Sequence, residues 1–233
     1  MRRYTPSSAR EEFESSLGEI RRVLPMVGPS RQLNADLKNY VLGASVLFLH
    51  AKLENYISDL FKGICQQACE KQAAATEIPE PLLGWMFLAD GHLERSRMFI
   101  ARNEEHAFIE STGEYLSTKL LRESSNYVTV NRFKTIDDKC YPSVKNLKRM
   151  FNRIGLKGIF GRLNARLRRQ VELELRSLNA LRGALAHSGV DGQLSQTEIR
   201  ERVKNTQQLV AAIDKETFYH LRRTFHVDVW KSP

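Results

Sequence analysis

The stretch NADLKNYVLGASVLFLHAKLENYISDLFKGICQQACEKQ, residues 34 to 72, decides the fold class of this chain. Its apolar residues recur at helical spacing over about ten turns, and no proline interrupts them. These residues are Leu37, Tyr40, Ala44, Leu47, Ala51, Leu53, Ile57, Leu60, Phe61 and Ile64. A helix of this length with so broad an apolar face is typical of the central helix of a bundle.

Further helices are predicted on both sides of this one. Apolar residues at helical spacing precede it at Phe13, Leu17, Ile20 and Leu24, and Pro25, Gly28 and Pro29 end that helix. A second long helix is expected from about Ala165 to Ala186. Ser195 and Glu198 have the spacing of a capping box at the start of a last helix.

We expect an all-α helical bundle in a single domain over residues 1–233, with its core over about 37–225. Residues 81–103 show a weaker helical pattern. Residues 104–142 mix β-branched residues with turn formers and show no clean period, so we expect an irregular insertion there. After it, Ser143 opens a short basic helix.

The composition is that of a soluble globular protein, with 42% hydrophobic and 27% charged residues. The longest apolar run, Val41–Leu49, is too short to span a bilayer, and the first residues lack the apolar core of a signal peptide. We therefore expect a cytoplasmic protein with no membrane contact. Cys65, Cys69 and Cys140 have no Cys or His at metal-ligand spacing, so we expect neither a metal nor a cofactor.

The positive charge of the chain is concentrated in one segment. The formal net charge is +9, and residues 143–169 alone contain nine basic residues and no acidic one. Apolar residues interleave with these cations, which indicates an amphipathic basic surface suited to a polyanion such as RNA. The candidate RNA-binding residues are Lys145, Lys148, Arg149, Arg153, Arg166, Arg168 and Arg169.

The stretch SLNALRGALAHSGVDG, residues 177 to 192, places an arginine on the apolar face of the long C-terminal helix. Arg182 falls within the stripe formed by Val171, Leu175, Leu178, Leu181 and Leu185. A cation there must be paired or must face a site, because an unpaired buried charge costs several kcal/mol. Glu54, on the apolar sector of residues 34–72 with His50, is a candidate partner. Arg182 is therefore either a site residue or half of a buried ion pair with Glu54.

The other face of this helix contains Arg176, Ala180, Gly183 and His187 at three- and four-residue steps. Gly183 costs about 1 kcal/mol relative to alanine within a helix, so we expect another helix to approach closely along Ala180 and Gly183. His187 lies in the last turn, where a protonated imidazole also interacts favourably with the helix dipole. It is therefore either a site residue or a helix cap.

These residues resemble the HEPN superfamily of all-α RNA-binding and RNA-cleaving domains. The shared motif is an arginine, four residues, a histidine, a small residue and a glycine near the end of a long C-terminal helix. LFLHAKLENYISDLF (47–61) resembles the long early helix of the RiboL-PSP-type branch, and YPSVKNLKRMFNRIGL (141–156) resembles the element before its motif helix. The likeness covers about Leu37 to Gly189 and leaves residues 104–142 unmatched.

The resemblance implies a metal-independent endoribonuclease that acts as a homodimer, with motifs from both subunits in one cleft. It implies that Arg182 holds the scissile phosphate. It also implies that His187 exchanges a proton with the 2′-hydroxyl or the leaving 5′-oxygen, which leaves a 2′,3′-cyclic phosphate. The family usually has Asn, Asp or His directly after the arginine, where this chain has Gly183. Asn179, one turn earlier, is the candidate replacement, with Arg176 and Glu54 as further supporting residues.

Three functional hypotheses follow. The first is a dimeric ribonuclease of a toxin–antitoxin or phage-defence module, with a cognate antitoxin protein as a further partner. The second is a non-catalytic RNA-binding module in which Arg182 pairs with Glu54 and His187 caps its helix. The third, a structural adaptor, has little use for a segment of nine cations without an anion.

Overall fold

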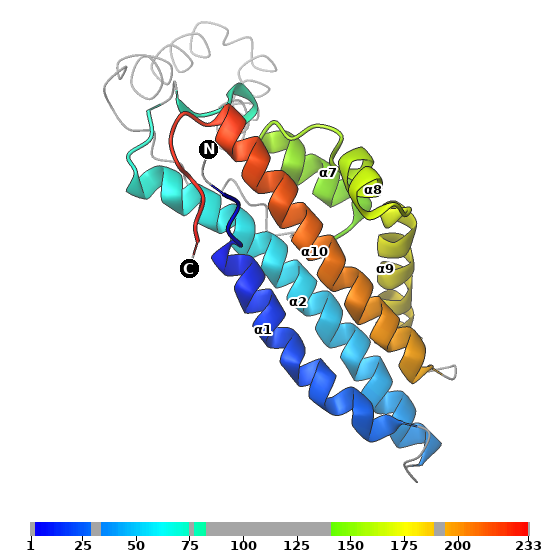
Figure 1. The fold of residues 1–233 in the computed structure, drawn as a ribbon. Coiled ribbons are helices and arrows are strands. Elements are labelled where there is room, and N and C mark those ends of the chain that lie inside the picture. Colours follow the sequence, from blue (N-terminus) through cyan, green and yellow to red (C-terminus); the bar gives the residue numbers. More distant parts are fainter. Residues whose placement is uncertain (1–2, 29–33, 75–76, 83–140, 189–193, 233) are drawn as a thin grey trace, which may run out of the picture.

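The long helix predicted over residues 34–72 is α2, Ala35–Glu70, in the computed structural model of the protein. The structure describes residues 3–28, 34–74, 77–82, 141–188 and 194–232. α2 lies against α1 (Ser8–Val23), α9 (Val171–Ser188) and α10 (Gln196–Thr224). Figure 1 shows α1, α2 and α10 side by side along the long axis of the bundle, with α7, α8 and α9 along the flank of α10. The all-α prediction is confirmed for the described residues.

The core forms because α2 presents apolar side chains to all three of these helices. Leu49, Leu53 and Ile57 of α2 are fully buried, and α1 adds Phe13 and Leu17. Truncating one such side chain to alanine typically costs about 2–5 kcal/mol. As predicted, α1 ends before Pro25, which lies in a 3-10 helix, η1, at Leu24–Val27.

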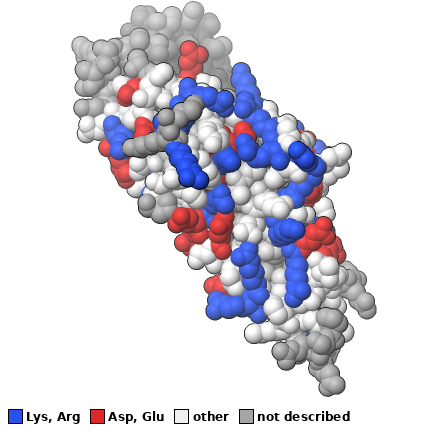
Figure 2. Space-filling model, in the orientation of Figure 1, with Lys and Arg blue, Asp and Glu red and all other residues white. Residues whose placement is uncertain are grey.

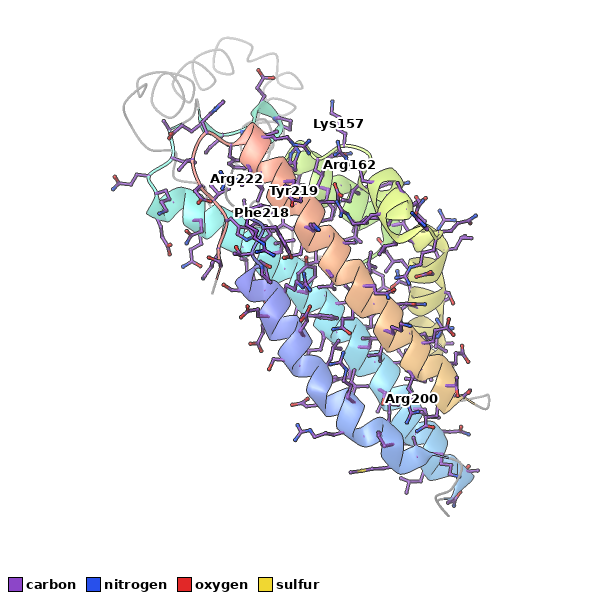
Figure 3. All side chains as sticks on the ribbon, viewed as in Figure 1. Lys157, Arg162, Arg200, Phe218, Tyr219 and Arg222 are labelled. Atoms are coloured by element: carbon purple, nitrogen blue, oxygen red, sulfur yellow. The ribbon has the colours of Figure 1, made fainter. Side chains whose placement is uncertain are left out.

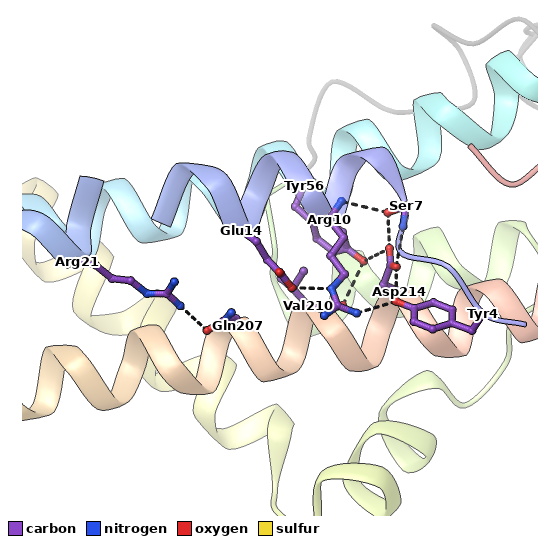
Figure 4. Close-up of polar contacts among 9 residues, drawn as sticks. All are labelled: Tyr4, Ser7, Arg10, Glu14, Arg21, Tyr56, Gln207, Val210 and Asp214. Atoms are coloured by element: carbon purple, nitrogen blue, oxygen red, sulfur yellow. Dashed lines mark hydrogen bonds and ion pairs between the residues drawn. The ribbon is translucent and has the colours of Figure 1, made fainter. Parts of the chain in front are cut away.

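A buried carboxylate ties the start of the chain to α10 (Figure 4). Asp214 is completely buried, and its Oδ2 accepts hydrogen bonds from the Tyr4 hydroxyl at 2.8 Å and the Ser7 amide at 3.1 Å. Its Oδ1 accepts one from the Ser7 hydroxyl and a longer one, 3.4 Å, from Tyr56. Burial raises the pKa of Asp214, although the bonds from Ser7 and Tyr4 oppose this rise. The N-terminal segment is thus anchored to the bundle by hydrogen bonds.

The basic segment, residues 143–169, forms two short helices, and the long helix predicted from about Ala165 begins only after it. α7, Val144–Arg153, is capped by the Ser143 side chain as predicted. α8 spans Ile159–Leu167, and α9 begins four residues later. The prediction of one helix from Ala165 to Ala186 is therefore wrong in its first turns. Arg168 adopts a left-handed conformation, with φ 53°, that ends α8.

The break is stabilised by a side chain from α8. Asn164 accepts a hydrogen bond from the Val171 amide at 2.9 Å, which satisfies one of the first amides of α9. The last helix, α10, begins after Ser195 as predicted, but the predicted capping box is wrong, because the Ser195 side chain makes no capping hydrogen bond. Glu198 instead accepts from Arg202 one turn later.

The structure describes only part of the central region of the chain. Of the predicted insertion at 104–142, only Tyr141 and Pro142 lie within the described residues, and the weak helical pattern at 81–103 lies almost entirely outside them. Within the described ranges, no helix combines the length and the apolar character that crossing a membrane requires.

Candidate active site

Arg182 lies on α9, which packs against α2, and it contacts the aromatic ring of Tyr141. The residue is half-buried, and its guanidinium carbon lies 5.8 Å from the centre of the Tyr141 ring. This distance is within the range of a cation–π contact. Arg182 and Glu54, both among the described residues, form no ion pair, which would require a nitrogen and an oxygen of the two side chains within 4.0 Å. The predicted alternative, a buried Arg182–Glu54 ion pair, is therefore wrong.

Asn179 connects the two helices to the segment that carries Tyr141. Its Nδ2 donates a hydrogen bond to the carbonyl of Pro142 at 3.1 Å, and its Oδ1 lies 2.9 Å from Nε2 of His50. Because a carbonyl only accepts, this arrangement fixes the orientation of the amide and makes Nε2 of His50 the donor. Asn179 thus uses its side chain to hold His50 and Pro142 together.

Tyr141 is held in place through both its ring and its backbone. The His50 ring lies 4.9 Å from the Tyr141 ring, between centroids. The Tyr141 carbonyl accepts from the Ser143 amide at 2.7 Å and from Asn146 at 3.1 Å. Both donors belong to the start of α7, so the cap of that helix also positions Tyr141 and the contact of its ring with Arg182.

His50 is a buried histidine whose environment favours its neutral form. It is 2% exposed, and this burial lowers its pKa. The hydrogen bond with Asn179 and the charge of Glu54 oppose the lowering, whereas the charge of Arg182 adds to it. His50, Glu54 and Arg182 are therefore close enough to influence one another electrostatically. Since His50 is buried, it can position its neighbours but cannot touch a substrate.

His187 lies on a different face of α9 from Arg182. It is exposed in the last turn of the helix, and Arg176 and Ala180, in earlier turns of α9, are exposed as well. A Cβ added to Gly183 would meet no atom of the residues that the structure describes within 4 Å. On an ideal helix, five residues turn the side chain by about 140° and advance it by about 7.5 Å. One chain therefore does not bring Arg182 and His187 together on one face.

The basic segment is less available than its sequence predicts. Arg153 is buried, with 6% exposure, and its assignment to a solvent-facing RNA surface is wrong. Arg166 donates to Glu216 at 2.8 Å, and Arg169 donates to the Asn205 side chain at 2.7 Å. The remaining candidates, all exposed, are Lys145, Lys148, Arg149 and Arg168. Of these, Lys148 pairs with Glu172 at 2.7 Å.

The sequence interpretation missed Tyr141 and gave His50 no role beyond its place in the apolar sector. The available signal for Tyr141 was its position two residues before the capping Ser143, which places it at the start of a helix. No pattern in the sequence indicates that Asn179 joins His50 to Pro142, because Pro142 and Asn179 are 37 residues apart.

The arrangement suits phosphate chemistry. Arg182 offers a guanidinium that can bind a phosphate with two parallel hydrogen bonds, and His187 offers an exposed imidazole for proton transfer. Among the residues that the structure describes, no group of three or more His, Cys, Asp or Glu residues is placed to hold a metal ion.

Comparison with known proteins identifies the family of the chain. The family model of RiboL-PSP-HEPN matches residues 11–217, which include most of α1, the central region and most of α10 as well as the segments noted above. Searches of curated proteins and of solved structures found no significant match. HEPN domains are generally ribonucleases or RNA-binding modules. The match covers most of the sequence and includes both Arg182 and His187, and the chain belongs to the RiboL-PSP-HEPN family.

Proposed function

We propose that this protein is a metal-independent endoribonuclease that acts on cytoplasmic RNA. The observation that carries the proposal is the placement of Arg182. A half-buried arginine held against Tyr141 without an ion-pair partner in the described part of the chain retains its charge for a ligand. An RNA phosphate supplies the negative charge that such an arginine binds.

The proposed reaction is a transesterification within the RNA. The 2′-hydroxyl loses its proton and its oxygen attacks the adjacent phosphorus, while the bond from phosphorus to the 5′-oxygen breaks. His187 accepts the first proton or donates one to the leaving 5′-oxygen, and Arg182 stabilises the charge that develops on the phosphate. The products are a 2′,3′-cyclic phosphate and a 5′-hydroxyl.

Two copies of the chain are proposed to complete the site, because Arg182 and His187 point in different directions from one helix. Open space next to Gly183 and the exposure of Ala180 leave this part of α9 accessible to another subunit. α2 offers a second exposed strip. Leu37, Tyr40 and Leu47 are 48%, 71% and 38% exposed, and Ala44 and Ala51 continue the three- and four-residue spacing of a coiled-coil seam.

On a helical wheel this strip of α2 borders Glu54, so it runs along the edge of the candidate site. A dimer that covers the strip is proposed to bring the two copies of α9 near each other. A toxin–antitoxin or phage-defence role, with an antitoxin protein that blocks the enzyme, is part of the same proposal.

The second candidate function is RNA binding without cleavage. Gly183 favours it, since the family usually has a polar residue directly after the motif arginine. Asn179, the candidate replacement, already uses its amide for His50 and Pro142. In this alternative His187 serves as a cation at the C-terminal end of α9.

One experiment separates the two functions. The purified protein is incubated with RNA in EDTA, and the ends of any fragments are identified. We expect cyclic phosphate ends from the unmodified protein and a loss of about 10²–10⁴-fold in rate for His187→Ala. His226→Ala is the matched control, because His226 is also exposed but lies beyond the end of α10. Equal rates for His187→Ala and the unmodified protein would favour the binding module.

A further inference from the structure

The C-terminal half of α10 presents only positive charge to solvent. Beyond Glu201 this helix has two acidic residues, Asp214 and Glu216, and they are 0% and 8% exposed. Its cations over the same length are half-buried or exposed: Arg202, Lys204, Lys215, Arg222 and Arg223. Folding therefore creates a basic surface from a helix whose composition is mixed.

α8 extends this surface, because it packs beside α10 and contains no acidic residue. Arg166 of α8 donates to Glu216, and Arg162 lies 3.9 Å from the other oxygen of the same carboxylate. Glu216 thus orients two cations of α8 and neutralises only part of their charge. Lys157, just before α8, is exposed.

Arg162 of α8 and Arg223 of α10 both lie near His220. Their charges lower its pKa, in addition to the larger effect of burial. Figure 3 shows Lys157 and Arg162 on the same face of the bundle as Tyr219 and Arg222. In Figure 2 basic side chains lie over the upper part of this face and also over its lower part, with acidic side chains between them. We call this set of residues, Lys157, Arg162, Arg166, Tyr219, Arg222 and Arg223, the α8–α10 surface.

An aromatic ring lies among these cations. Tyr219 is 39% exposed, and it packs on Phe218 with 5.3 Å between ring centroids. Arg223 donates from Nε to the Tyr219 carbonyl at 3.0 Å, and the Arg222 guanidinium lies 5.9 Å from the Phe218 ring. Surfaces that bind single-stranded nucleic acid combine two features. Cations bind the phosphate backbone, and an exposed aromatic ring among them stacks on a base.

We propose that the α8–α10 surface binds single-stranded RNA, with Arg162 and Arg222 on its phosphates and Tyr219 stacked on a base. The choice of RNA over other polyanions rests on the proposed function. The position of the surface does not, because it follows from burial and charge alone. Of the seven RNA-binding residues predicted from the basic segment, this surface contains Arg166. Its main contacts are instead Arg162 of α8 and Tyr219 and Arg222 of α10.

The test measures binding of a fluorescent single-stranded RNA by anisotropy, in the His187→Ala background so that the RNA stays intact. Loss of two phosphate contacts in Arg162→Glu/Arg222→Glu should lower the slope of log affinity against log salt by about 1.4. Tyr219→Ala should weaken binding by about 5- to 100-fold. The control, Arg22→Glu/Arg200→Glu, makes the same charge change at exposed positions of α1 and the far end of α10 (Figure 3).

An unchanged affinity and salt slope in Arg162→Glu/Arg222→Glu, or an equal loss in the control, would overturn the proposal. So would a loss of binding to phosphatidylglycerol vesicles without a loss of binding to RNA, since that result assigns the surface to a membrane. A second assay measures cleavage of a dinucleotide by the same variants with His187 intact. It separates the proposed RNA-binding surface from the proposed ribonuclease activity. A dinucleotide is too short to need the surface, so its cleavage tests the proposed function alone.

Discussion

His50 donates a hydrogen bond from Nε2 to Oδ1 of Asn179 over 2.9 Å, and this bond joins α2 to α9 beside Arg182. The other end of the Asn179 amide holds the carbonyl of Pro142, so the segment before α7 is bound to the same point. Tyr141 is thereby placed against both His50 and Arg182. The position of the motif arginine thus depends on residues outside the motif.

Asn179→Leu should destabilise the protein while keeping a similar side-chain volume. The change leaves the Nε2–H of His50 and the carbonyl of Pro142 without this partner, and each unsatisfied buried group costs about 1–3 kcal/mol. We expect the free energy of unfolding to fall by about 2–4 kcal/mol in urea titrations. Ser177→Ala, on the exposed side of the same helix, should change it by less than about 0.5 kcal/mol. Equal stability of both variants would contradict the role of Asn179.

Tyr141→Leu should reduce RNA cleavage without unfolding the protein. The guanidinium of Arg182 loses the ring that positions it, and misplacement of a binding group by about 1 Å can cost about 10²-fold in rate. Tyr141→Phe keeps the ring and should keep most of the activity. The measurement is kcat and KM for both variants. A phenylalanine variant as inactive as the leucine variant would show that the hydroxyl, rather than the ring, is needed.

Arg182→Met should leave the protein folded and inactive. Breaking a buried ion pair costs about 3–5 kcal/mol, whereas loss of a cation–π contact costs about 0.5–2 kcal/mol. Since Arg182 forms its contact with Tyr141, we expect the smaller value in thermal unfolding. Adding Glu54→Gln should then restore no stability. A large loss in the single variant that the double variant recovers would instead show that Arg182 and Glu54 are coupled.

Gly183→Leu and Leu47→Glu should each weaken the proposed dimer. The first fills the open space beside α9, and the second places a charge in the apolar strip of α2. Both positions are at least partly exposed, so the monomer fold should persist in circular dichroism. Sedimentation equilibrium of the unmodified protein should give a dimer at micromolar concentration. A monomer at that concentration would overturn the two-copy site.

Stability should decrease as the pH falls from about 7 to 5. Burial lowers the pKa of His50 and His220 from 6.5, so below that pH the unfolded chain takes up protons that the folded chain does not. The raised pKa of Asp214 acts in the opposite direction, because the folded chain then binds this proton more readily. Tm measured across the interval should fall, and His220→Gln should reduce the slope. A Tm that rises would show that Asp214 dominates.

The helices and the cap of α7 could be predicted because their signals are local. α2 follows from apolar residues at helical spacing, and α7 begins at a serine whose side chain accepts from the amide of Asn146 three residues later. The break before α9 could not be predicted in this way. It places Arg168, which is not a glycine, in a left-handed conformation, and Asn164 of the preceding helix stabilises the turn.

The same distinction between local signals and tertiary contacts applies to the candidate site. The sequence by itself determined the family, the all-α fold and the candidate pair of Arg182 and His187, because a motif and its periodicity need only short-range order along the chain. Tertiary structure decided that Arg182 contacts Tyr141 and not Glu54, since the hydrogen bonds of Asn179 bring Tyr141 to it.

Tertiary structure also decided which cations are free for a ligand. The sequence contains a block of nine basic residues, but the counter-ions of several of them come from outside that block. Lys148 pairs with Glu172, and Arg166 pairs with Glu216 of α10. The free positive surface then includes Arg222 and Arg223, because the acidic residues in the same part of α10, Asp214 and Glu216, are buried. Charge is a property of the sequence, whereas its exposure depends on which helix covers it.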